Sequence, residues 1–257
     1  MATAAEIAEY LDGLLQTRET PDYAGAVNGL QLDGGGPVRG VAAAVDFSRR
    51  AVEGAVAGGA NLLLVHHGMF WGGAQPIRGA AYERLRLLFA HDVAVYASHL
   101  PLDRHAELGN NVLLANALGL APSGEFARFK TIAVGVRGEA ELPTGELVAR
   151  AAAFAQAHGG ATVATPYAHG RRTRRWAICT GAGASSETLA EAEALDVDTL
   201  IVGEGPHHTA VEAEERGVVV IYAGHYATET LGVAALAEHV GQRFGVPWSF
   251  IEAPTGL

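Results

Sequence analysis

Short apolar runs alternate with amphipathic segments along the first part of this chain. Buried strands are predicted where the runs are continuous, over residues 38–45, 61–65 and 93–97. Helices are predicted where apolar residues recur at helical spacing, over 2–16, 48–58, 78–91 and 106–118. Ser48 stands where it can cap the second of these helices. Strands that alternate with helices favour a parallel or mostly parallel α/β sheet.

The same alternation resumes after residues 120–124, where a Pro-Ser-Gly sequence interrupts the pattern. Strands are predicted over 129–136, 161–167, 175–180, 199–203, 218–223 and 248–252. Helices are predicted over 144–157, 186–195 and 226–240, with a short helix after Pro206. We therefore expect an α/β protein of two similar α/β domains with mixed, mostly parallel sheets.

Polar residues that can bind metals follow several of the first strands. They are Asp46, His66, His67, His99 and Asp103. In open α/β sheets ligands bind outside the carboxyl ends of the strands, which is where these residues fall. Neighbouring side chains in extended backbone point to opposite sides, so the histidine pair can serve two metals, or one metal and one structural hydrogen bond. A surface His-Gly turn without chemistry is the alternative.

A second group follows the apolar strand over residues 218–223. His225 and Glu229 are spaced i, i+4 at the start of a predicted helix, which puts both on one helical face. Imidazole and carboxylate together suit zinc, iron, manganese or cobalt, and the lack of thiolate ligands argues against a closed structural zinc site. An ordinary helix start with an exposed Glu is the alternative. If His225 joins the first cluster, residues 218–257 return to residues 1–122 as one metal-binding domain, and 123–217 form the second.

Other features allow weaker interpretations. Thr180-Gly181-Ala182-Gly183 could cradle phosphate through backbone N–H groups or form a simple tight turn. Glu204 could be a general acid or base, or a helix-start carboxylate beside a solvated His207-His208 pair. Phe70 and Trp71 could line a pocket or belong to the core.

Composition narrows the class of protein. The chain has 257 residues, 49% hydrophobic and 18% charged, and a formal net charge of -10, which disfavours a general nucleic-acid or anionic-membrane surface. The one basic cluster, Arg171, Arg172, Arg174 and Arg175, is expected to be a solvated strand edge. The single cysteine, Cys179, lies in an apolar run and is expected to be a small buried side chain. With no signal peptide and no apolar run near 18 residues, a cytoplasmic protein is expected.

Taken together, these motifs resemble the NIF-three-like dinuclear metal-centre family, whose members are often named GTP cyclohydrolase type-two homologues. The resemblance runs nearly end to end and matches the shorter bacterial form. Its motifs are Asn28-Gly29-Leu30-Gln31, Val45-Asp46-Phe47-Ser48, Val65 to Trp71, His99 to Asp103, Gly109-Asn110-Asn111, Thr180 to Gly183, Gly203 to His208 and Gly224 to Glu229.

The resemblance implies a NIF-three-like fold with a two-metal site. The family's ligands fall on His66, His67, Asp103, His225 and Glu229. His66 and Asp103 would bind one divalent metal, His67 and His225 the other, and Glu229 would bridge them. His99 and Asp46 would be near neighbours. The family also implies a toroidal homohexamer.

The resulting hypothesis is a metal-dependent hydrolase, in which Glu229 and Glu204 are the candidate catalytic residues. The family name implies GTP ring opening, but no residue pattern reads guanine, so the substrate is left as a small molecule or nucleotide. The alternative is a non-catalytic metal-binding partner, for example a metal chaperone or a regulatory subunit.

Overall fold

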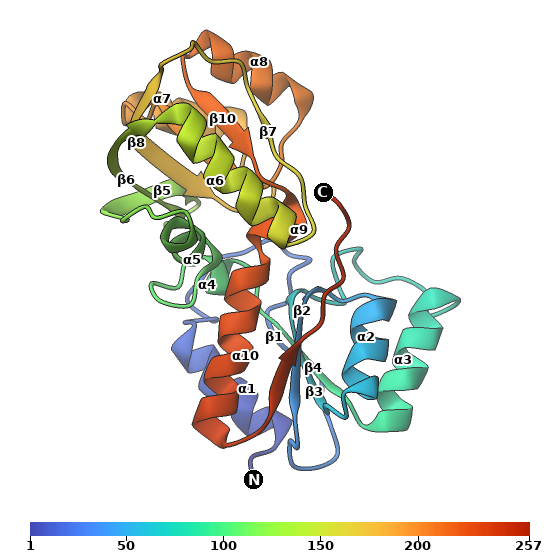
Figure 1. Cartoon of the computed structure of the whole chain (residues 1–257). Helices are drawn as coiled ribbons and strands as arrows, with labels where there is room; N and C mark the ends of the chain where they lie inside the picture. The colour runs from blue at the N-terminus through green and yellow to red at the C-terminus, as the bar shows by residue number, and fades with distance from the viewer. The chain divides into compact units, whose positions relative to one another are not determined.

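The protein consists of two compact units. The computed structural model describes residues 1–257. The first unit comprises Met1–Leu102 and Gly232–Ala253, and the second comprises Asp103–Leu231 and Pro254–Leu257 (Figure 1). Each unit contains a β-sheet with helices packed on it, which confirms the predicted α/β class with two mixed sheets.

The sheet of the first unit has five strands in the order β1-β4-β3-β2-β11. These are β1 (Gly29–Leu32), β2 (Val41–Asp46), β3 (Leu62–His67), β4 (Ala94–Ala97) and β11 (Trp248–Phe250). Strands β4, β3, β2 and β11 run parallel, and only β1 is antiparallel to its neighbour. Strands β2 and β3 are buried along almost their whole length, as expected for a parallel sheet covered on both faces.

Helices cover both faces of this sheet. Helices α2 (Arg49–Ala57) and α3 (Ala80–His91) lie on one side, and α1 (Ala4–Leu14) lies on the other beside α10 (Thr230–Phe244) (Figure 1). Ser48 caps α2 by accepting a hydrogen bond from the Ala51 N–H, as predicted. Val52, Leu63, Leu88 and Val95 join α2, α3 and the sheet in one core.

The second unit has a six-stranded sheet in the order β5-β6-β8-β9-β10-β7. The strands are β5 (Gly124–Phe129), β6 (Ile132–Pro143), β7 (Val163–Ala164), β8 (Arg172–Cys179), β9 (Thr199–Val202) and β10 (Val219–Tyr222). Strands β8, β9 and β10 are parallel and form the centre, and the remaining pairings are antiparallel. The centre therefore repeats the parallel arrangement of the first unit.

The helices of this unit are α5 (Asn110–Ala117), α6 (Thr144–Ala157), α7 (Ser186–Ala194), α8 (His207–Glu215) and the short α9 (His225–Thr228), while α4 (Leu100–Asp103) spans the division between the units. The fully buried Trp176 packs in one core with Leu114 of α5, Leu147 of α6 and Ile221 of β10. Because α5 and β10 contribute to this core, the units change over after residues 102, 231 and 253. We had expected boundaries after residue 122 and, if His225 joined the first cluster, after residue 217.

One predicted helix is interrupted. The pattern predicted a continuous helix over 226–240, but α9 ends at Thr228 and α10 begins at Thr230, with Glu229 between them at φ -110° and ψ 4°. Threonine hydroxyls compete with the helical N–H groups here, because Thr228 donates to the His225 carbonyl (3.0 Å) and Thr230 to that of Ala227 (2.9 Å). Strands β1 and β5 and helix α4 were not predicted.

Candidate metal centre

Three imidazoles meet at the carboxyl edge of the first sheet. His66 and His67 end β3, and His99 follows the end of the adjacent parallel strand β4. Parallel neighbours end on the same edge, so the topology gathers residues that are more than thirty positions apart. One ring nitrogen from each histidine lies within 4.8 Å of the others, a spacing that suits a metal ion.

Each of these imidazoles is oriented by an acceptor at Nδ1. The acceptors are the Ser98 carbonyl for His66, Asp46 Oδ1 for His67 and Asp22 Oδ1 for His99, each at 2.9 Å. Since carbonyl and carboxylate oxygens only accept, Nδ1 must be the donor, which puts the lone pair of each neutral ring on Nε2. This arrangement is typical of metal-binding histidines, whose second nitrogen donates to a carboxylate or carbonyl.

Asp22 is a residue of this cluster that the sequence pattern does not reveal. Besides His99, its carboxylate accepts the Leu100 N–H (3.0 Å) and the Asn28 side-chain amide (2.8 Å). Burial opposes the charged form, but the hydrogen bond and charge of His99 outweigh it and lower the pKa of Asp22. Asp22 belongs to a loop without periodicity, and its partner His99 is 77 positions away, so no local signal could have found it.

The second unit repeats this design at the carboxyl edge of its own parallel strands. Glu204 follows β9 and His225 follows β10, and these strands are adjacent. His225 Nδ1 donates to Glu204 Oε1 (2.8 Å), and His225 Nε2 lies 3.2 Å from Glu229 Oε2. The Glu229 side chain is only 3% exposed, so the predicted pairing of His225 with Glu229 is present although the helix between them is interrupted.

The imidazole of His225 has a raised pKa. Its burial disfavours the charged ring, but hydrogen bonds and charges from Glu229 and Glu204 raise the pKa of His225 to about 9. Glu204 and Glu229 place two negative charges around one imidazole. Either a proton on the ring or a bound divalent cation can offset this negative charge.

The lack of a side chain at Gly181 leaves space for His225 and Glu229. Gly181 follows β8 with φ +62°, and a Cβ at this position would overlap Glu229 Oε1 and lie 3.3 Å from His225 Nε2. The Gly181 N–H is donated to the Thr228 hydroxyl (3.1 Å). The Thr180 and Ala184 N–H groups are likewise bonded, to Asn111 and the Glu204 carbonyl. Because the N–H groups of Thr180 and Gly181 are already bonded within the protein, the tight-turn interpretation of residues 180–183 is favoured over a phosphate cradle.

Asp103 is held in the same unit. It is 7% exposed and accepts a hydrogen bond from the Asn110 side chain (2.8 Å). The Asn111 side chain donates to the Asp103 carbonyl (3.2 Å) and accepts the Thr180 N–H (2.9 Å), which ties Asp103 to the loop that carries Gly181. The charges of both Asp103 and Glu229 act on the buried Cys179 thiol.

The donor set thus falls into two groups. The first unit brings together His66, His67 and His99 with Asp46, and the second brings together His225, Glu229 and Glu204 and holds Asp103 through its asparagines. Imidazole and carboxylate donors, oriented by further hydrogen bonds, fit divalent metals. The individual ligand and catalytic roles of these residues stay predictions.

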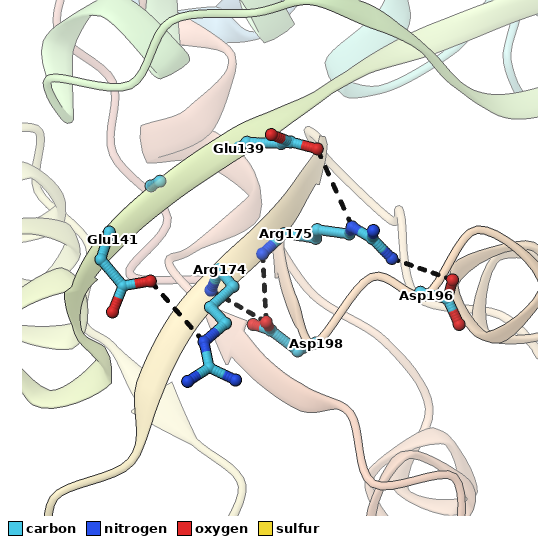
Figure 2. A pocket seen from close by; sticks show the side chains of 7 residues that line it. Glu139, Glu141, Arg174, Arg175, Asp196 and Asp198 are labelled. Atoms are coloured by element: carbon cyan, nitrogen blue, oxygen red, sulfur yellow. Dashed lines mark hydrogen bonds and ion pairs between the residues drawn. The ribbon is translucent and has the colours of Figure 1, made fainter.

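Two other candidate features lie away from these groups. His207 and His208 are exposed at the start of α8. Arg174 and Arg175 line a cavity of about 700 Å³ beside β6 and β8 (Figure 2). Their guanidinium charges are compensated, because Arg174 pairs with Glu141 (3.6 Å) and Arg175 with Asp196 (2.9 Å). Asp198 accepts the backbone N–H groups of both arginines.

The protein is a two-unit α/β protein with a candidate metal centre. Its histidine and carboxylate groups lie at the carboxyl edges of both sheets. Residues 2–255 match the model of the family described as Duf34/NIF3 (NGG1p interacting factor 3), and the chain belongs to this family. No helix reaches the length and apolar character that a membrane span requires.

Several curated relatives carry the name GTP cyclohydrolase 1 type 2 homolog. The protein of Deinococcus radiodurans is 40% identical over 98% of this chain and 94% of its own length. That of Halobacterium salinarum is 42% identical over 92% and 93%, and that of Escherichia coli 35% identical over 97% of both.

Solved structures show the same fold. A protein titled ybgI, of unknown function, superposes with a TM-score of 0.89 at 34% identity over all of both chains. TTHA1606 from Thermus thermophilus follows with a TM-score of 0.85 at 36% identity, also over both whole chains. Reduced HcgD from Methanocaldococcus jannaschii has a TM-score of 0.81 at 22% identity over 98% of both chains, which supports the fold alone.

Proposed function

We propose that the two donor groups combine into one dinuclear metal centre and that the protein is a metal-dependent hydrolase. The observation that carries the proposal is the shared orientation of the imidazoles, in which His66, His67 and His225 each direct Nδ1 to an acceptor within their own unit. Such pre-orientation fits metal binding through Nε2.

The proposal assigns five ligands. His66 and Asp103 would hold one divalent ion, His67 and His225 would hold the other, and Glu229 would serve both. Divalent ions held there would lower the pKa of a bound water and offset the negative charge that develops in the transition state of a hydrolysis. Zinc, iron, manganese and cobalt all suit this set of donors.

The surrounding carboxylates have supporting tasks in this proposal. Asp46 and Glu204 hold His67 and His225 in the orientation that exposes Nε2 to a metal. The Glu204 side chain is 45% exposed, so its carboxylate can also exchange a proton with a bound substrate as general acid or base. Glu229 is nearly buried and is better suited to bridging metals than to proton exchange with solvent.

The reaction class is tested with the metal-loaded protein and a panel of nucleotides including GTP, phosphoesters and cyclic amides. We expect turnover of at least one compound, and we expect Glu204→Gln to lower kcat while the bound metal is retained. The names of the relatives place GTP in the panel. If the protein has its full metal content and turns over none of the compounds, the alternative of a non-catalytic metal-binding partner is favoured instead.

The toroidal homohexamer and the cytoplasmic location are further parts of the proposal. Size-exclusion chromatography with light scattering measures the assembly directly. A molar mass corresponding to a monomer or dimer would contradict the proposed hexamer and would leave the assignment of the metal ligands unaffected.

A further inference from the structure

An exposed indole stands beside the imidazole cluster of the first unit. The Trp71 ring centroid lies 4.8 Å from that of His99 and 5.6 Å from that of His67, and the planes are nearly perpendicular, at 84° and 78°. Trp71 nevertheless remains 38% exposed. The indole therefore forms a wall of the candidate metal site and is not part of the core.

A second aromatic ring extends this wall. The Tyr23 ring lies 6.3 Å from Trp71 and 6.0 Å from His99, with 53% of the residue exposed. Paired aromatic side chains that stay partly exposed beside polar, metal-competent groups are typical of ligand-binding sites. Tyr23 and Trp71, named here the aromatic wall, have this arrangement.

The two loops that carry the aromatic wall are fixed to each other. Gly25 packs on the other loop so closely that a Cβ there would lie 3.1 Å from the Trp71 carbonyl oxygen. Gln31 bridges the loops, because its side chain accepts the Met69 N–H (2.7 Å) and donates to the carbonyls of Ala26 (3.0 Å) and Val27 (2.9 Å). A wall built in this way binds a ligand with little loss of loop entropy.

The loop also stores backbone strain. Val27 adopts φ +42°, a left-handed conformation that β-branched residues rarely tolerate. Residues forced into such conformations cluster at functional sites, where the surrounding structure holds them. Here Gln31 holds the Val27 carbonyl, and the next residue, Asn28, accepts the His99 N–H (2.8 Å). The strained loop therefore positions both the aromatic wall and an imidazole of the cluster.

We propose that the aromatic wall is a substrate subsite that stacks a flat, unsaturated ring and holds a polar group of that ring within reach of the metal-binding imidazoles. The inference rests on the proposed function and narrows its substrate class to compounds with a planar, unsaturated ring. A ligand ring stacked parallel to the Trp71 indole would, like the indole, be nearly perpendicular to the imidazole planes of His67 and His99. Stacking of this kind recognises the flat face of a ring and tolerates different substituents at the edge of the ring.

The test uses calorimetric titration of the metal-loaded protein with guanosine, adenosine, cytidine and nicotinamide, with ribose as the ringless control. We expect saturable binding of at least one ring compound and none of ribose. Trp71→Ala should weaken that binding by about tenfold or more, as expected for loss of one stacking partner, whereas Trp71→Phe should retain most of it. Trp248, equally exposed at 40% but on β11, provides the matched control, and Trp248→Ala should bind like the parent protein.

Metal content, measured on the same samples, separates this inference from the proposed function. Trp71→Ala is expected to keep the parent's metal content, so a loss of ring binding in it reports on stacking alone. A metal-loaded parent that binds none of the rings, or a Trp71→Ala variant with parent affinity, would overturn the inference and leave the metal centre intact. A Trp71→Ala variant that changes only the oligomeric state would also overturn it and assign the aromatic wall to subunit contact. A parent protein that binds no metal would instead contradict the proposed function.

Discussion

The imidazoles of both units share one hydrogen-bonding arrangement, in which Nδ1 donates to an acceptor and Nε2 is left as the candidate metal ligand. The histidines themselves could be identified from the sequence because they follow apolar strands. Their acceptors could not, since Ser98 acts through its backbone carbonyl and Asp22 is 77 positions from His99. Side-chain partners of this kind depend on tertiary contacts that leave no periodic pattern.

Cys179 is expected to be chemically inert in the folded protein. Burial, with the charges of Asp103 and Glu229, raises the pKa of its thiol to about 12. At about pH 8 only roughly one thiol in ten thousand is then ionised, and the thiolate is the reactive form. Reaction with a disulfide reagent such as DTNB should be very slow in the native protein and complete after denaturation. Fast, stoichiometric labelling of the native protein would contradict the buried position.

Gly181 is expected to be essential for metal binding by the donor group of the second unit, which consists of His225, Glu229 and Glu204. In Gly181→Ala the new Cβ overlaps Glu229 Oε1, so the carboxylate must move away from His225. We expect at least a tenfold loss of metal affinity, measured by titration with a chelating indicator.

Gly170→Ala is the matched control for this substitution. Gly170 has φ +78°, similar to the +62° of Gly181, but a Cβ there meets nothing within 4 Å. Both variants therefore carry the conformational cost of about 1–2 kcal/mol, while only Gly181→Ala displaces the Glu229 carboxylate. Equal metal affinities in the two variants would show that the contact with Glu229 is unimportant.

At the level of strands and helices, the predictions succeeded where the pattern was long and regular. Helix α6 has the predicted bounds of residues 144–157, and the central parallel strands of both sheets lie close to their predicted positions. Strand β5, with its partly exposed pattern, and the short edge strand β1 gave no clear alternation. The break at Glu229 was missed because threonine hydroxyl bonding overrides helical spacing there.

The loops around the aromatic wall are expected to depend on Gln31. Gln31→Ala removes three hydrogen bonds that join residues 26–27 to Met69. We expect a loss of about 1–3 kcal/mol in the free energy of unfolding, measured by urea denaturation. Gln75→Ala is the control, because Gln75 is exposed and makes one hydrogen bond, to Gly72, so its loss should stay within about 0.5 kcal/mol. Similar stabilities of the two variants would contradict the bridging role.

In the molecule as a whole, the donor groups are divided between two units that each have their own core. The sequence predicted the residue types and their places at strand ends, and the family membership was correctly inferred from motifs spread over the chain. The sequence pattern did not show that α5 and β10 join the core of the second unit, because that core forms through contacts between residues far apart in the chain.

Metal stoichiometry tests the central claim most directly. Elemental analysis of the purified protein, loaded with zinc, iron, manganese or cobalt, should give two ions per chain. His67→Ala and Glu229→Ala should each lower that number, whereas His208→Ala, at an exposed histidine outside both groups, should leave it at two. Full metal occupancy in both the His67 and the Glu229 variants would contradict the dinuclear centre.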